Sequence, residues 1–183
     1  MTRGYGVNRR RSSKADAVRG RQRFYRALAA LALLVCLPGA MLTSSAAGDE
    51  VVAMQQVTDF RHEAEISRAQ ELVMVLEFSS EDCVYCHKLE ALFLLPMQRN
   101  ADYDDKILLR SLSLDEGNHV IDFDGRSITT GEFAARYGVS LTPTLLFLDA
   151  DGNELSERLV GIWSEDFYGG FIDSRIDEAR RKL

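Results

Sequence analysis

The chain has 183 residues, and its 22 Lys or Arg and 28 Asp or Glu give a formal net charge of −6. Nine of the basic residues lie within residues 1–26, beside a single acid, Asp16. The rest of the chain keeps 13 basic and 27 acidic residues, a net charge of −14, which argues against a nucleic-acid partner.

The first 47 residues have the pattern of an export signal. The basic start is followed by an apolar run over 27–37, by Pro38-Gly39 and by small residues over 43–48. This pattern predicts a signal peptide over 1–47, cleaved after Ala46 or Ala47, and an exported protein. The apolar run is shorter than the roughly 20 residues of a membrane span. An uncleaved anchor through residues 27–42 is the alternative. Residues 48–183 are then expected to form one domain.

The remaining chain alternates between helical and strand patterns. The apolar run over 72–78 predicts a buried strand, and apolar spacing after Cys83 predicts a helix that Pro96 kinks or ends. Gly138 is expected to follow the end of another helix. This order predicts an α/β fold with a mixed central sheet and helices on both faces. The remaining expectations are helices over 51–69, 128–137 and 167–183, strands over 106–114, 144–148 and 154–160, and a turn over 149–153.

Cys83 and Cys86 are the only cysteines outside the predicted signal, since Cys36 lies within it. A pair three residues apart closes a loop too short to stabilise much, so its value is chemical. At a helix N-terminus the first cysteine is favoured as a thiolate that attacks a disulfide, and the second, one turn deeper, resolves the mixed disulfide. This chemistry needs no bound cofactor. Structural zinc is the alternative, but there is no second cysteine pair, and the three histidines are scattered.

Two further positions are candidates for the same site. Glu77 is the single charged residue in its apolar strand, six positions before Cys83. It is either a buried acid that exchanges a proton with Cys86 or an edge residue that points to water. Thr142-Pro143 directly precedes the strand over 144–148. If its peptide bond is cis, the bend exposes the backbone of Thr142 to an extended substrate; a trans bond at an ordinary strand start is the alternative.

Three ordered motifs resemble the thioredoxin family. They are VLEFSSEDCVYC over 75–86, RYGVSLTPTLL over 136–146, and Gly161, and the similarity covers residues 72–183. CVYCHKLEALFLLP more narrowly resembles the C-terminal thioredoxin-like domain of the periplasmic membrane thiol reductase, and SoxW-like periplasmic thioredoxin-related proteins. The resemblance implies that Cys83 is the nucleophile, Cys86 the resolving thiol and Pro143 a cis-proline.

The resemblance also places Glu77 where thioredoxin has its buried Asp. It implies a redox-active Cys83–Cys86 disulfide, protein disulfides or dithiols as substrates, Thr142 and Pro143 as substrate contacts, and a membrane electron donor. The chain departs from thioredoxin at Val84-Tyr85, which replace Gly-Pro, and at Asp82, which replaces Trp. The redox potential therefore cannot be transferred from the family.

The expected function is a periplasmic thiol–disulfide oxidoreductase that acts as a reductase. Glu81 and Asp82 oppose a thiolate at Cys83, and a poorly stabilised thiolate makes a weaker oxidant. The alternative is a copper(I) carrier that uses the same thiols, with His87 as a possible third ligand. Residues 115–131 are longer than in thioredoxin. Val120–Ile128 is expected to form a hairpin near the cysteines and one wall of the substrate groove.

Overall fold

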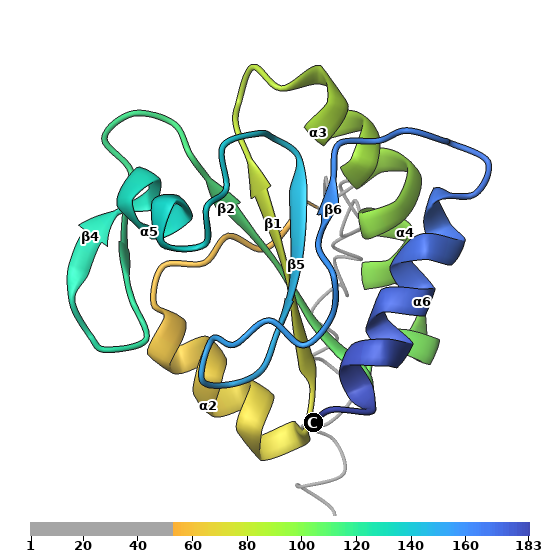
Figure 1. Cartoon of the computed structure of the whole chain (residues 1–183), viewed down its shortest axis with the longest axis horizontal. Helices are drawn as coiled ribbons and strands as arrows, with labels where there is room; N and C mark the ends of the chain where they lie inside the picture. Colours follow the sequence, from red (N-terminus) through yellow and green to blue (C-terminus); the bar gives the residue numbers. More distant parts are fainter. Residues whose placement is uncertain (1–52) are drawn as a thin grey trace, which may run out of the picture. The chain divides into compact units, whose positions relative to one another are not determined.

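The computed structural model describes residues 53–183 (Figure 1). The predicted signal peptide, the alternative anchor and Cys36 all lie outside these residues. Within them, no helix combines the length and the apolar composition that crossing a membrane requires.

A four-stranded mixed sheet forms the centre of the fold, in the order β2-β1-β5-β6. β1 (Val73–Ser79) pairs in parallel with β2 (Ile107–Ser113) and antiparallel with β5 (Thr144–Leu148). β6 (Leu159–Val160) pairs antiparallel with β5. All seven residues of β1 are buried, as expected for a central strand covered on both faces. The predicted α/β fold with a mixed sheet is confirmed.

Helices cover both faces of this sheet (Figure 1). On one face, a core that includes Val73 and Val75 packs against α3 (Val84–Leu89), α4 (Leu95–Gln98) and α6 (Tyr168–Arg180). On the other face, Met74, Leu76 and Phe78 pack against α2 (Phe60–Gln70) and α5 (Thr130–Arg136). Successive residues of β1 therefore alternate between the two cores, which determines the face to which Glu77 belongs.

The segment before α2 differs from the helix predicted over 51–69. Its residues 55–57 lie beside β2: Ser111 donates its N–H to the carbonyl of Gln55, and Val57 donates to the carbonyl of Ser111 (both 2.9 Å). The helix begins only at Phe60, because the side chain of Asp59 accepts the N–H of Arg61 and caps it.

The helix after Cys83 does not end at Pro96. A π-helical turn, η1 (Glu90–Leu94), connects α3 to α4, which continues to Gln98 before the short 3₁₀ turn η2 (Ala101–Tyr103). In the π turn the N–H of Leu95 bonds to the carbonyl of Glu90, five residues back. This wider turn makes room for the ring of Pro96, so a proline inside the helical pattern is tolerated.

The predicted hairpin exists, but its predicted place is wrong. β3 (His119–Ile121) and β4 (Ser127–Thr129) form a separate antiparallel pair. At its tip, Phe123 lies against Gly152, in the turn after β5. That turn lies at the opposite end of the sheet from Cys83, because β5 runs antiparallel to β1. The hairpin tip therefore forms no wall of a groove at the cysteines.

Two other boundaries differ from prediction. α5 begins at Thr130, not at 128, since Ile128 belongs to β4 and Thr129 forms a capping box with Glu132. The strand predicted over 154–160 is reduced to β6 and a single bridge between Glu154 and Leu148.

Candidate active site

Cys83 and Cys86 form a disulfide at the start of α3, with their Cα atoms 5.2 Å apart. Cys83 is the N-cap residue and is half-buried, whereas Cys86 is only 1% exposed. The N–H of Cys86 donates to Sγ of Cys83 at 3.1 Å. A backbone donor directed at this sulfur favours its thiolate after reduction. The geometry therefore makes Cys83 the accessible sulfur and Cys86 the enclosed one.

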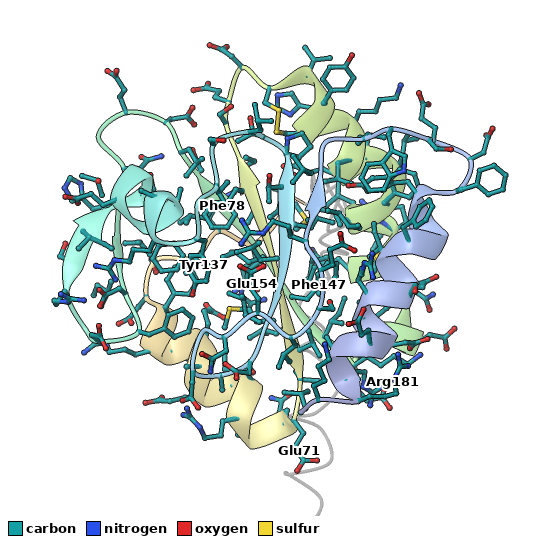
Figure 2. The ribbon with its side chains drawn as sticks, in the orientation of Figure 1. Glu71, Phe78, Tyr137, Phe147, Glu154 and Arg181 are labelled. Carbon is teal, nitrogen blue, oxygen red and sulfur yellow. A yellow bond between two sulfur atoms is a disulfide. The ribbon has the colours of Figure 1, made fainter. Side chains whose placement is uncertain are left out.

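The disulfide is drawn as a yellow bond at the start of α3 in Figure 2, and the turn that precedes Cys83 is held on both sides. The N–H of Glu81 donates to both carboxylate oxygens of Asp115, each at 3.1 Å. Nε2 of His87 lies 2.8 Å from the carbonyl oxygen of Glu81. Asp115 and His87 thus position the cysteines from the loop after β2 and from α3. Sequence reasoning missed this role of Asp115, because only the parallel pairing of β1 with β2 brings it to the turn.

Glu77 lies inside the fold on the face that carries α3. Its side chain is fully buried, and neither carboxylate oxygen has a hydrogen-bond partner within residues 53–183. Burial disfavours the charged form and raises the pKa of Glu77 to about 9, and the nearby carboxylate of Glu90 adds to this rise. Glu77 is therefore protonated at neutral pH, and the alternative of an edge residue that points to water is wrong.

Glu90 and Tyr168 are the ionisable neighbours of this buried acid. Glu90 lies one helical turn beyond Cys86 and is half-buried. Burial and the Glu77 carboxyl together raise the pKa of Tyr168, whose hydroxyl donates to the carbonyl of Gly161 at 2.7 Å. The sequence contained a signal for Glu90, since positions i and i+4 of a helix share a face, but the sequence analysis did not use it.

Thr142 and Pro143 lie at the same end of the sheet as the disulfide. Thr144, the next residue, pairs with Phe78 near the end of β1. The Thr142–Pro143 peptide bond is cis, as the resemblance implies. The Pro143 carbonyl accepts the N–H of Gly161 at 2.8 Å, which links this loop to the residue after β6. Pro143 is buried and Thr142 is half-exposed, so a substrate would reach Thr142 more directly.

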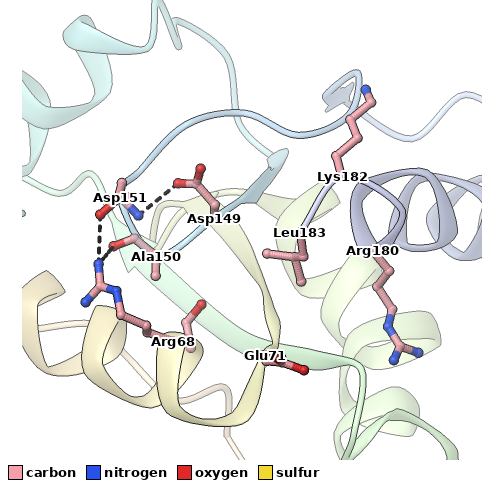
Figure 3. A pocket seen from close by; sticks show the side chains of 9 residues that line it. Arg68, Glu71, Asp149, Ala150, Asp151, Arg180, Lys182 and Leu183 are labelled. Atoms are coloured by element: carbon pink, nitrogen blue, oxygen red, sulfur yellow. Dashed lines mark hydrogen bonds and ion pairs between the residues drawn. The ribbon is translucent and has the colours of Figure 1, made fainter.

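Two other features of the described residues lie outside this constellation. No three His, Cys, Asp or Glu side chains within 53–183 are grouped as ligands for a metal ion. A pocket of about 430 Å³ lies beside Arg68 and the turn after β5, where Arg68 bonds to Asp151 at 2.7 Å (Figure 3). It lies at the end of the sheet away from Cys83 and belongs to no part of the disulfide site.

Comparisons with known proteins agree with this geometry. The family described as "Thioredoxin-like domain" matches residues 60–172. No curated protein sequence matches the chain significantly. Among solved structures, a DsbH oxidoreductase is 21% identical, with 69% of this chain and 87% of that chain covered and a TM-score of 0.49.

Two further structures are similarly distant. The DsbD C-terminal domain of Neisseria meningitidis is 15% identical over 66% of this chain and 98% of that chain, with a TM-score of 0.46. The periplasmic thioredoxin SoxS of Paracoccus pantotrophus is 21% identical over 58% and 98% of the two chains, with a TM-score of 0.40. Such identities are too low to transfer a substrate or a location.

The family match covers most of the chain and contains the sheet, the cysteine pair and the flanking helices as far as the start of α6. The sequence-based expectation of a thiol–disulfide oxidoreductase is confirmed by this match together with the disulfide at the helix start. The chain belongs to the thioredoxin-like family, and its Cys83–Cys86 disulfide lies at the start of α3.

Proposed function

We propose that this protein is an exported reductase of protein disulfides. The observation that carries the proposal is the asymmetry of the two sulfurs: Cys83 is half-exposed and accepts a backbone N–H, and Cys86 is enclosed. An accessible thiolate that a backbone N–H stabilises suits the attacking role. A sheltered thiol suits the resolving role, because the disulfide bond that Cys86 can reach is the mixed disulfide formed at Cys83.

The reaction begins from the dithiol form. The Cys83 thiolate attacks one sulfur of the substrate disulfide, forms a mixed disulfide and releases the other substrate sulfur as a thiolate. The Cys86 thiol then loses its proton and attacks Sγ of Cys83, which releases the second substrate thiolate. Two electrons have passed to the substrate, and the protein holds the Cys83–Cys86 disulfide. A dithiol partner at the membrane returns the two electrons.

Glu77 is the proposed acid–base group of this cycle. The ionised fraction of Glu77, which is small at neutral pH, accepts the proton of Cys86 during resolution, and the carboxylic acid returns the proton when a donor reopens the disulfide. The pKa of about 9 supports the second role, since the group then holds its proton in the oxidised protein at neutral pH. Thr142 and Pro143 are proposed to contact the substrate backbone beside the disulfide.

The direction of electron flow is inferred from charges beside Cys83. Glu81 and Asp82 are exposed in the turn before it, and the Asp115 carboxylate binds the N–H of Glu81. These negative charges oppose the thiolate that the N–H of Cys86 favours, and a less stabilised thiolate makes a weaker oxidant. Export is inferred from residues 1–47, which we expect to act as a signal peptide or, uncleaved, as an anchor through 27–42.

The reduction potential of the Cys83–Cys86 couple, measured with insulin-reduction activity, tests this proposal. We expect activity and a potential closer to thioredoxin's, about −270 mV, than to DsbA's, about −120 mV. A potential near that of DsbA would contradict the assignment as a reductase. Stoichiometric copper(I) binding without disulfide exchange would instead support a carrier that uses the same thiols.

A further inference from the structure

The rim of the disulfide site carries large apolar side chains that point to solvent. Val84 and Tyr85, between the cysteines, are 75% and 61% exposed. Leu141, before Thr142-Pro143, is 64% exposed, and Trp163 and Phe167, after β6, are 54% and 70% exposed. Isolated exposed apolar residues are ordinary, but a group of them around a reactive disulfide marks a surface for a partner.

The three segments that carry these residues meet at one end of the sheet (Figure 1). The Gly161 N–H bonds to the Pro143 carbonyl, and this contact joins the loop after β6 to the loop before β5. An ion pair between Lys88 and Glu165 joins the loop after β6 to α3. We call the surface formed by Val84, Tyr85, Leu141, Trp163 and Phe167 the apolar rim.

Trp163 is held in place on this rim. Its ring packs edge-on against Tyr168, with centroids 5.0 Å apart, and against Phe171 at 5.5 Å. An aromatic side chain that is fixed by its neighbours and still half-exposed loses little conformational freedom when a partner covers it. This is the property of a binding hot spot.

The charges next to the apolar rim are negative. Glu81 and Asp82 precede Cys83 and Asp166 precedes Phe167; all three are exposed, and none has an ion-pair partner among residues 53–183. The lysine of α3, Lys88, is already paired with Glu165. A partner that covers the rim therefore meets uncompensated negative charge.

We propose that the apolar rim binds protein substrates whose disulfide lies in a cationic segment with an aromatic or aliphatic side chain beside the cysteine. The inference rests on the proposed reductase function and adds the class of substrate. The apolar side chain contacts Trp163 and Phe167 while Lys or Arg residues face Asp82 and Asp166. Opposite charges speed the encounter, and apolar contact slows dissociation of the mixed disulfide complex.

Two disulfide peptides that share one aromatic residue beside the cysteine test the inference, one flanked by Lys and the other by Glu. With the full chain in its reduced form, we expect the Lys peptide to react about tenfold faster in dilute buffer, with a smaller difference at high salt. The Asp166→Lys variant should reduce this preference. Asp104→Lys makes the same charge change in the exposed loop before β2, at the other end of the sheet, and should keep it.

A small aromatic disulfide without charged flanks distinguishes a failure of the proposed reductase function from a failure of the proposed substrate class. If the reduced protein attacks no disulfide at all, the reductase function is contradicted. If it reduces the small disulfide and both peptides at equal rates, only the substrate class is contradicted. Trp163→Ala should raise KM for the Lys peptide. Binding to vesicles of neutral or anionic lipid that Trp163→Ala abolishes would overturn the proposal in favour of a membrane surface.

Discussion

The carboxyl group of Glu77 is buried close enough to Glu90 for the second carboxylate to raise the pKa of the first. Glu77 projects from β1, and Glu90 follows Cys86 by four residues on the helix that packs over the same face. The acid is thus enclosed on the face of the sheet that α3 covers, and its proton affinity is set by burial and by one neighbouring charge.

Glu77→Gln should slow resolution of the mixed disulfide by about ten- to a thousandfold, the range of general acid–base effects. The neutral isostere fills the same space but neither accepts nor returns a proton. Rapid-mixing kinetics of mixed-disulfide decay at neutral pH measures the step. Glu65→Gln, on the exposed face of α2, is the matched control and should leave the rate unchanged. An unaltered rate in Glu77→Gln would exclude a catalytic role for this carboxyl.

The stability of the oxidised protein should depend on pH through the same residue. Folding raises the pKa of Glu77 from 4.5 to about 9, so the folded state binds this proton more tightly than the unfolded state does. The contribution is fully present below about pH 4.5 and is lost as the pH rises toward 9. The difference in unfolding free energy between wild type and Glu77→Gln should therefore fall over this range. Denaturant titrations that gave a constant difference would contradict the raised pKa.

Glu90→Gln should lower the pKa of Glu77 while the carboxyl remains buried. The substitution removes the nearby negative charge but leaves the larger effect of burial, so the pKa stays above its ordinary value. An NMR titration of the Glu77 side-chain carbon measures this directly. A titration midpoint that did not move would show that the two carboxyl groups are uncoupled.

The hairpin of β3 and β4 should contribute to stability rather than to substrate choice. Asp122 is fully buried and accepts hydrogen bonds from Arg136 at 2.7 Å and from the N–H of Arg126 at 2.8 Å. Burial alone would raise the pKa of Asp122, but its bonds to Arg136 and Arg126 hold the pKa below its ordinary value.

Asp122→Asn should therefore lower the unfolding free energy by about 1–3 kcal/mol. This loss is smaller than that expected for breaking a fully buried ion pair, because Arg136 is 40% exposed. Asp124→Asn, at the exposed position two residues on, should have little effect. Chemical denaturation compares the two variants. If the Asp122→Asn variant instead changed the relative rates at which different protein disulfides are reduced, with the unfolding free energy unaltered, the hairpin would have a role in substrate choice.

The elements that the sequence predicted well are those with a strong local pattern. The apolar run before Ser79 predicted β1 within one residue, and the pattern after Cys83 predicted the start of α3. Gly138, at a φ of 64°, ends the turn after α5 as its position suggested. Cys83, Cys86 and the burial of Glu77 also followed from local arguments about helix starts and isolated charges.

The features that the sequence did not predict depend on contacts between distant segments. Residues 55–57 became extended because the edge of β2 offered them hydrogen bonds, which no local pattern indicates. The sequence predicted the hairpin at the cysteine end of the sheet. Its tip points to the opposite end because Phe123 packs on Gly152, a contact between distant segments. At Pro96 the sequence predicted a kink or a helix end, and the helix instead continues past a π turn that precedes the proline.

A trapping experiment with two single variants tests the central claim most directly. Cys86→Ser, incubated in reduced form with a protein disulfide, should accumulate a mixed disulfide through Cys83, which mass spectrometry of the nonreduced complex identifies. Cys83→Ser should accumulate none, because Cys86 is enclosed. A mixed disulfide through Cys86 in the second variant, or the absence of any adduct in the first, would contradict the assignment of Cys83 as the attacking sulfur.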